Sequence, residues 1–220
     1  SKTGFLYEAG YCLVVEGAGK YKNMLAVVMD TPSEQAQFIE IERLLKMLAL
    51  SGTERMLDIG CGTGELERLA IQRFPNLAIV GLDATPAMVT VARGKLSGWP
   101  GVQIEVGEAE SLPFGAEHFD VVVAANILHH IRDVSRMLAE GMRVLRGGGQ
   151  LFVLDWCRDF WHCRLLHHWL RATDRTYVRM YGLQELCVPL RASGIAVQQA
   201  LRFIAPPLYG LMCVKGVKRS

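Results

Sequence analysis

Segments typical of strands and segments typical of helices alternate along residues 54–155 of this chain. Short runs rich in branched apolar residues predict strands at 55–59, 77–82, 102–106, 119–125 and 150–155. Amphipathic stretches between them predict helices at 65–74, 85–96 and 134–144. The run 119–125 is almost continuously apolar, which is typical of a strand buried on both faces. This alternation predicts an α/β fold with an open, doubly wound and mostly parallel sheet.

The last part of the chain departs from that alternation. Residues 183–192 predict a helix that Gly194 ends. Two further strands are expected at about 195–203 and 208–217, and Pro206-Pro207 favours a turn between them. We therefore expect an antiparallel pair that closes one side of a seven-stranded sheet.

The chain is expected to form one domain with two less regular segments. Residues 31–50 begin with a capping box and carry one apolar face, which predicts a helix in an N-terminal cap. Residues 156–181 are aromatic and basic without a clear period; we interpret them as a lid, and the alternative is that their aromatic rings fill the core. The domain 1–220 then divides into a cap at 1–50, a cofactor-binding core at 51–155, a lid and substrate segment at 156–194 and a closing strand pair at 195–220.

Composition narrows the class of protein. The 220 residues are 50% hydrophobic, enough for a sizeable core, and the net charge of +2 is too small to indicate a nucleic-acid partner. No apolar run reaches the length of a membrane span, and no leader-like segment opens the chain. The six cysteines form no C-x-x-C pair, so we expect reduced thiols in a cytoplasmic protein. The arginines of 156–181 suit a solvated face, with an anionic substrate or a peripheral membrane contact as alternatives.

A glycine-rich loop follows the first predicted strand, with the sequence D-I-G-C-G-T-G over residues 58–64. Glycines let a chain turn tightly and let a ligand approach its backbone. A dinucleotide-binding loop has the pattern G-x-G-x-x-G, but here the third glycine is Gly64 and Glu65 follows it. Carboxylates at Asp58 and Glu65 would repel a pyrophosphate and attract a ligand with ammonium and sulfonium groups. The loop favours S-adenosylmethionine over NAD, and a simple tight turn is the structural alternative.

Polar residues also follow the next three strands. Asp83 stands after the second strand, at a spacing that suits ribose hydroxyls, and Glu108 lies in the loop after the third. Asn126, His129 and His130 follow the fourth. Ligands of open α/β sheets bind beyond the carboxyl ends of the strands. These loops are therefore expected to form one site.

Taken in order, these loops resemble those of the class I S-adenosylmethionine-dependent methyltransferases. The likeness is greatest to the small-molecule branch that includes the ubiquinone/menaquinone biosynthesis enzymes. It covers about residues 54–155 and is carried by the run L-D-I-G-C-G-T-G at 57–64 and by the turn at 145–149. The resemblance implies a Rossmann-like methyltransferase fold, S-adenosylmethionine as the cofactor and a small molecule as the methyl acceptor.

The resemblance also implies a role for each loop. The glycines would line the methionine part of the cofactor, and Asp83 would bind its ribose. Met88 and residues 109–110 would lie against the adenine, while the carbonyl of Ala125 would lie near the methionine amine. At Glu108 the family often has Asp. The predicted cofactor-binding residues are Asp58, Gly60, Cys61, Gly62, Gly64, Asp83, Ala84, Met88, Glu108, Ala109, Glu110, Ala125 and Asn126.

Three residues at the ends of the fourth and fifth strands are candidate catalytic groups: His129, His130 and Asp155. We expect one histidine to act as a base toward a phenol or another hydroxyl, with Asp155 orienting that histidine or the substrate. The structural alternatives are that the histidines stabilise the turn before the next helix and that Asp155 N-caps the helix that follows it. The candidate bases favour oxygen as the acceptor atom and leave nitrogen and carbon open.

Several other functions are weighed against methyl transfer. An NAD-dependent oxidoreductase is disfavoured by the glycine spacing, whereas a protein that binds S-adenosylmethionine without catalysis stays open. The motif N-I-L-H at 126–129 differs from the Asn/Asp-Pro-Pro-Tyr of enzymes that methylate amino groups of nucleic acids, so no nucleic-acid partner is expected. The spacing of His162, Cys163, His167 and His168 matches no zinc pattern, so no metal is expected. The apolar composition suits either a lipophilic acceptor or a subunit interface, which leaves the oligomeric state open.

Overall fold

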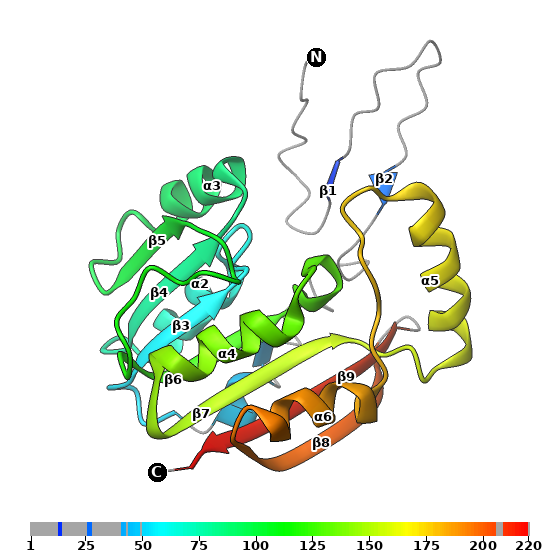
Figure 1. Cartoon of the computed structure of the whole chain (residues 1–220). Coiled ribbons are helices and arrows are strands. Elements are labelled where there is room, and N and C mark those ends of the chain that lie inside the picture. The colour runs from blue at the N-terminus through cyan, green and yellow to red at the C-terminus, as the bar shows by residue number, and fades with distance from the viewer. Residues whose placement is uncertain are drawn as a thin grey trace.

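A computed structural model of the chain describes residues 13–14, 26–27, 41–42, 44–48, 50–205 and 209–219. In that part of the chain a seven-stranded sheet has the strand order β5-β4-β3-β6-β7-β9-β8 (Figure 1). Its strands are β3 (Arg55–Ile59), β4 (Ala78–Asp83), β5 (Val102–Val106), β6 (Phe119–Ala125), β7 (Leu145–Trp156), β8 (Ile195–Ala205) and β9 (Tyr209–Lys218). A separate antiparallel pair is formed by β1 (Leu13–Val14) and β2 (Ala26–Val27).

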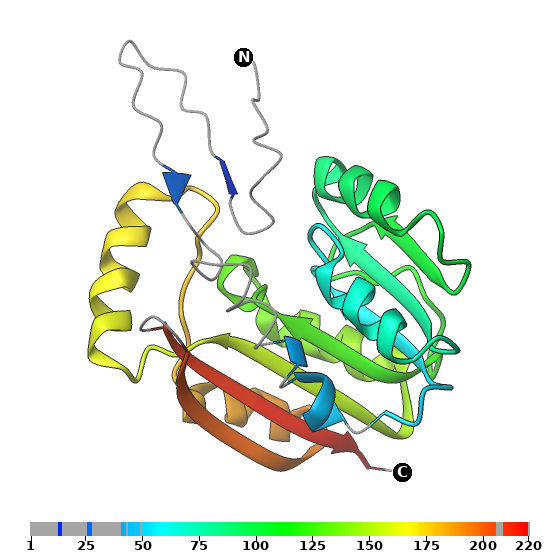
Figure 2. The same ribbon diagram turned by 180° about the vertical axis from the view of Figure 1, so that it is seen from behind.

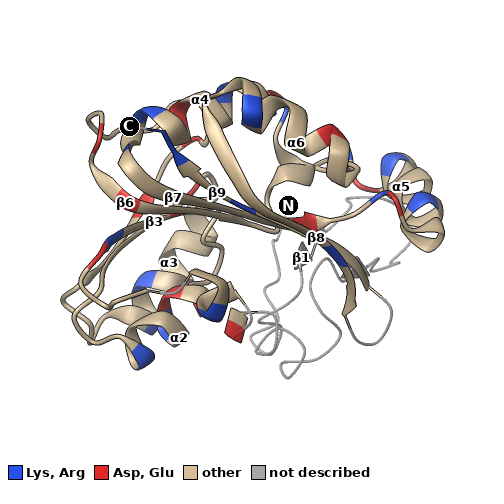
Figure 3. Cartoon of the chain, turned by 90° about the horizontal axis from the view of Figure 1, so that it is seen from below, with Lys and Arg blue, Asp and Glu red and all other residues tan. Residues whose placement is uncertain are grey.

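The helices cover both faces of this sheet. They are α2 (Glu65–Arg73), α3 (Pro86–Leu96), the short 3₁₀ helix η1 (Leu128–His130), α4 (Val134–Val144), α5 (Trp161–Thr173) and α6 (Leu183–Ala192). Figure 3 shows α4 and α6 on one face and α2 and α3 on the other. Residues 41–42 and 44–48 are also helical and lie on the side of α2 (Figure 2). The doubly wound sheet that the alternation predicts is thereby confirmed.

The alternation of side chains along each strand divides the core into two main layers. On β6, Val122 and Ala124 pack toward α4 and α6, whereas Val121 and Val123 pack toward α2. All four side chains are at most 1% exposed. This explains why the strand is apolar without a period of two, since helices cover it on both sides.

The closing strands follow the prediction in type and position. β9 pairs antiparallel with β7 on one side and with β8 on the other, so it runs against the rest of the sheet. Residues 206–208, which hold the predicted turn, lie outside the described residues. The same is true of most of the predicted cap, including the capping box at 31–34.

Two elements differ from the prediction. β7 begins at Leu145 and not at residue 150, because the glycines at 147–149 form an irregularity inside the strand and not a turn before it. The pairing with β6 shows this irregularity, since Phe119 pairs with Leu145 whereas Val121 pairs with Gln150. The helix α5 lies within the segment that shows no clear period. Apolar side chains occur on both its buried and its exposed side, so its sequence lacks the single apolar face that indicates a helix.

Candidate cofactor and acceptor site

The three glycines between β3 and α2 serve different purposes. A Cβ atom on Gly60 would lie only 2.6 Å from the side chain of Ile127. One on Gly64 would lie 2.8 Å from the side chain of Leu96. A Cβ atom on Gly62 would meet nothing within 4 Å, although its φ of +54° also favours glycine. The outer glycines hold the loop close to its neighbours, while Gly62 leaves backbone open to a ligand.

Asp83, at the end of β4, joins this loop to the two that follow. Its Oδ2 accepts a hydrogen bond from the N–H of Gly62 at 3.0 Å, and its Oδ1 accepts one from the N–H of Thr85 at 2.8 Å. Its backbone carbonyl accepts a hydrogen bond from the N–H of Gly107 at 3.1 Å. Each carboxylate oxygen retains a further lone pair, so this half-buried group is able to accept hydroxyl hydrogen bonds as well.

A buried pair of carboxyl groups lies beside the glycine loop, of which Asp58 is a predicted site residue and Glu67 is not. Asp58 is 3% exposed and Glu67 is 0% exposed. Gly81 pairs with Asp58 across the sheet, and a Cβ atom on Gly81 would lie 2.6 Å from Oε1 of Glu67. Asp58 Oδ1 and both Glu67 oxygens accept no hydrogen bond from the described residues. Two such groups at close quarters need a shared proton.

The pKa values of this pair move in the direction that burial dictates. Burial raises the pKa of Asp58 to about 7, and the negative charge of Asp83 adds to the effect. Burial and the charge of Asp58 raise the pKa of Glu67 well above its usual range. Glu67 precedes the buried Ala70 and Ile71 by three and four residues. An acidic residue on the apolar face of a helix was the signal that sequence reasoning overlooked.

Glu65 contributes less to the site than predicted. Its carboxylate forms ion pairs with Lys95 and, at 2.8 Å, with Arg68. Because these cations balance its charge, Glu65 does not repel an anionic ligand as the sequence argument assumes. The negative charge near the loop comes instead from Asp83 and from the pair formed by Asp58 and Glu67.

The predicted cofactor contacts near the ends of β4 and β5 differ in how accessible they are. Ala109 is buried in the core, whereas Ala84 and Glu108 are exposed and Met88 and Glu110 are half-buried. Ala109 thus supports the loop after β5 from inside, and the other four side chains are accessible to different degrees. Their contact with the cofactor stays a prediction.

Asn126 marks the end of β6 with an unusual conformation. Its φ of +55° lies in the left-handed region, and its N–H donates to the carbonyl of Leu154 at 2.8 Å. Its side-chain Oδ1 is buried and accepts no hydrogen bond from the described residues. Such strain and an unsatisfied acceptor are features of ligand-binding positions. The neighbouring Ala125 is half-buried and directly follows Ala124, which pairs with Ile59 at the end of β3.

His129 and Asp155 are brought together, as predicted. Nδ1 of His129 donates to Oδ1 of Asp155 at 2.8 Å, and both side chains are 2% exposed. The imidazole stacks on the ring of Trp156 with the centroids 4.8 Å apart and the planes within 4°. Asp155 also accepts hydrogen bonds from the N–H groups of Leu128 and Trp156. The alternative role of Asp155 as the N-cap of the next helix is wrong, because α5 begins after Phe160.

His130 is the more accessible of the two histidines. Its Nδ1 lies 3.1 Å from the carbonyl oxygen of Thr176. A carbonyl only accepts, so Nδ1 carries the proton and Nε2 of the neutral ring is free to accept one. Burial and the neighbouring His129 lower the pKa of His130, which keeps the ring neutral at physiological pH. This arrangement suits a general base.

The described cysteines and His167 pack in the protein interior. The five described cysteines are all free and buried, and Cys12 lies outside the described residues. Burial raises the pKa of the Cys61 thiol, which agrees with the interpretation of Cys61 as a packing residue. Nδ1 of His167 lies 2.6 Å from the hydroxyl of Tyr177. Among the described residues, no group of three or more His, Cys, Asp or Glu side chains is placed to hold a metal ion.

Comparison with known proteins agrees with this geometry. Residues 57–153 match the family model described as "Methyltransferase domain". The chain is 30% identical over 177 residues to the uncharacterized methyltransferase YcgJ of Bacillus subtilis, an alignment that covers 79% of this chain and 69% of YcgJ. The crystal structure of YcgJ superposes with a TM-score of 0.72 at 23% identity, covering 83% of this chain and 99% of that one.

A second relative has a named reaction. The chain is 35% identical over 115 residues to the ubiquinone/menaquinone biosynthesis C-methyltransferase UbiE of Geobacter sulfurreducens. That alignment covers 50% of this chain and 45% of the relative, so the chain spans less than half the length of several curated relatives that it matches. The family model, the YcgJ alignment and the strand order of the sheet agree with one another. The chain belongs to the class I methyltransferases, whose cofactor is S-adenosylmethionine.

Proposed function

We propose that this chain transfers a methyl group from S-adenosylmethionine to a small acceptor that is aromatic or lipophilic. The observation that carries the proposal is the placement of two polar clusters at one edge of the sheet. The loop 60–64 follows β3 and Asp83 ends β4. His129 and His130 lie in η1 after β6, and Asp155 lies near the end of β7. These four strands are neighbours and parallel, so both clusters lie beyond the same strand ends.

The first cluster fits the cofactor. Gly62 leaves space beside its backbone, and the Asp83 carboxylate retains acceptors for the ribose hydroxyls. The buried Oδ1 of Asn126 accepts no hydrogen bond from the described residues, and the ammonium group of the methionine moiety would supply a donor. S-adenosylmethionine provides a methyl group on a positively charged sulfur, whose leaving group is a neutral thioether.

The second cluster supplies a base. His130 accepts the hydroxyl proton of the acceptor at Nε2, while the carbonyl of Thr176 holds the proton on Nδ1. Asp155 likewise accepts a hydrogen bond from Nδ1 of His129, which leaves Nε2 of that ring able to accept a proton. His129 is almost fully enclosed, so we place the proton transfer at His130 and assign His129 and Asp155 to positioning.

Oxygen remains our first choice for the acceptor atom, with carbon and nitrogen as alternatives. Deprotonation of a phenol spreads negative charge over its oxygen and its ortho and para carbons. The same base therefore serves O-methylation and C-methylation, and the position of the ring decides between them. The UbiE relative is named a C-methyltransferase, so carbon is the acceptor atom in that protein. The cytoplasmic location likewise remains part of the proposal and rests on the free thiols.

Turnover tests the proposal directly. We expect the chain to form S-adenosylhomocysteine with phenols, quinol precursors or lipophilic amines, and mass spectrometry with NMR of the product would identify the methylated atom. His130→Ala should lower kcat by about 10²–10⁴-fold and leave the affinity for S-adenosylmethionine unchanged. In the wild type, kcat/KM should rise with pH through a pKa below the 6.5 of an ordinary histidine.

Two results would contradict the catalytic assignment. Normal turnover in His130→Ala, His129→Ala and Asp155→Ala would exclude a histidine base. Binding of S-adenosylmethionine without turnover of any acceptor class would instead support a non-catalytic binding protein. His168→Ala is the matched control, because this exposed histidine of α5 lies outside both clusters.

A further inference from the structure

The helix α5 is apolar on both sides, which is unusual for a helix at the surface. Its inner side packs Cys163, Leu166 and Leu170 into a cluster with Trp156 and Tyr177. This contact buries one apolar side of α5, as is usual for a helix at the surface of a domain. The opposite side would then be expected to carry polar residues only.

Large apolar side chains occupy that opposite side instead. Trp161 is 73% exposed, Leu165 is 63% exposed and Trp169 is 44% exposed. Their spacing of four residues places them in one row along the helix, which we call the outer stripe of α5. Side chains of this kind gathered on one exposed face mark an interaction surface, since monomeric proteins rarely leave them in water.

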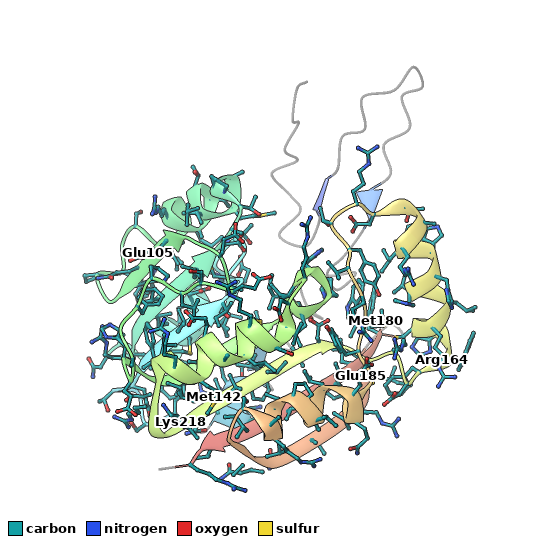
Figure 4. All side chains as sticks on the ribbon, in the orientation of Figure 1. Glu105, Met142, Arg164, Met180, Glu185 and Lys218 are labelled. Carbon is teal, nitrogen blue, oxygen red and sulfur yellow. The ribbon has the colours of Figure 1, made fainter. Side chains whose placement is uncertain are left out.

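The exposed charged side chains on α5 itself are all positive. Arg164 and Arg171 lie on α5, Arg175 follows it, and none of the three forms an ion pair with a described residue. The helix itself contains no Asp or Glu, and Asp174, directly after it, is buried. Figure 3 shows the resulting basic helix at the margin of the molecule, and Figure 4 labels Arg164 on its outer side.

This combination fits an anionic membrane surface. Tryptophan and leucine insert at the level of the lipid headgroups, and arginines beside them bind acidic lipids. A second copy of α5 fits poorly, because two such helices would bring like charges together. None of the helices in the described part of the chain has the length and hydrophobicity of a membrane span.

The outer stripe is also connected to the candidate site. The chain leaves α5 and passes beside the histidines: the N–H of Val178 donates to the carbonyl of His129 at 2.8 Å, and the carbonyl of Thr176 bonds His130. Figures 1 and 2 both show α5 beside the end of β7, far from β5. We propose that the outer stripe seats this chain on an anionic membrane surface, from which a lipophilic acceptor reaches the histidines. Membrane binding itself requires neither S-adenosylmethionine nor turnover, so it is measured independently of the proposed function.

Vesicle binding of the whole chain tests this proposal. We expect sedimentation with vesicles of phosphatidylcholine and phosphatidylglycerol, and weaker binding to phosphatidylcholine alone or at high salt. The tryptophan emission should shift to the blue, because Trp161 and Trp169 leave water while Trp156 is already buried. The double variant Trp161→Ala/Trp169→Ala should bind about tenfold more weakly, from the loss of inserted apolar area. Arg164→Glu/Arg171→Glu should abolish the preference for anionic vesicles.

Matched controls lie on α6. Val188 is 65% exposed and Arg191 is exposed, so Val188→Ala and Arg191→Glu change an exposed apolar and an exposed basic side chain without touching α5. Both should bind vesicles as the wild type does.

No binding of the wild type to anionic vesicles would overturn the proposal, as would equal binding by the α5 variants. A dimer in sedimentation equilibrium that Trp161→Ala/Trp169→Ala converts to a monomer would also overturn it, since a second copy would then occupy the stripe.

Discussion

At the scale of single residues, the pair formed by Asp58 and Glu67 shows how a functional loop is built at some cost to stability. A carboxyl group loses its hydration when it is buried, and a second one nearby makes ionisation of both unfavourable. The pair persists because α2 packs Glu67 over the space that Gly81 leaves free. Its proton therefore belongs to the folded state, and the pH dependence of stability should reveal it.

We expect the free energy of unfolding to fall as pH rises from about 5 to 8 through the contribution of this pair. Both pKa values are raised on folding, so the folded chain binds more protons than the unfolded chain above the ordinary carboxyl pKa. Glu67→Gln should reduce that fall by about 1–3 kcal/mol. Urea unfolding at several pH values measures it. The control Glu105→Gln lies on the edge strand β5 (Figure 4) and should show the same dependence of the unfolding free energy on pH as the wild type. The same dependence in Glu67→Gln would refute the shared proton.

At the scale of elements, the closing strands depend on positions where only glycine fits. Gly216 on β9 lies between β7 and β8, opposite Leu151 and Val197. A Cβ atom there would lie 2.1 Å from Cγ2 of Ile195 and 3.1 Å from the carbonyl oxygen of Ala196. The strand before it bulges at the same level, between Val197 and Gln199. The register of the pair is thus set by the absence of a side chain.

Two glycine substitutions should have opposite effects for this reason. Gly216→Ala should destabilise the chain by about 1–3 kcal/mol, because the backbone of a central strand must shift to admit the methyl group. Gly94→Ala should stabilise it by about 0.5–1 kcal/mol, because Gly94 lies inside α3 and a Cβ atom there meets nothing within 4 Å. Thermal unfolding of both variants provides the test. Equal stability of the two would show that the β9 backbone adapts freely.

At the scale of the whole molecule, the cofactor loops connect elements that are distant in sequence. Asp83 links the loops after β3, β4 and β5 through hydrogen bonds to Gly62, Thr85 and Gly107. A ligand held by these loops must stabilise the entire fold, because it binds the folded chain only.

S-adenosylmethionine at a hundred times its dissociation constant should therefore raise the unfolding free energy by about 2.7 kcal/mol, which is about 5–10 °C in Tm for a chain of this size. NAD should cause no shift. Asp83→Ala should weaken S-adenosylmethionine binding about 10- to 100-fold in calorimetric titration, since it removes a charged acceptor. Glu105→Ala should bind as the wild type does. A shift with NAD, or unchanged affinity in Asp83→Ala, would contradict the site described here.

The sequence by itself determined the succession of elements and the place of the site. Strand β6 is recognisable because both of its faces are covered, and the loop 60–64 because glycines are needed where backbones and a ligand approach each other. These patterns are local, so they can be recognised in the sequence without knowing which segments become neighbours. The predicted strands and helices of the core accordingly lie within a few residues of the observed ones, apart from the early start of β7.

The tertiary structure alone decided which polar side chains are exposed, paired or buried. Glu65 is balanced by Lys95 from α3, and Glu67 is buried against β3 and β4, although the two differ by two positions on one helix. The bond of His130 to Thr176 and the apolar stripe of α5 were equally hidden, because each depends on contacts between segments far apart in the chain. Charge and burial depend on which side chains become neighbours, and segments far apart in the chain become neighbours only in the tertiary structure.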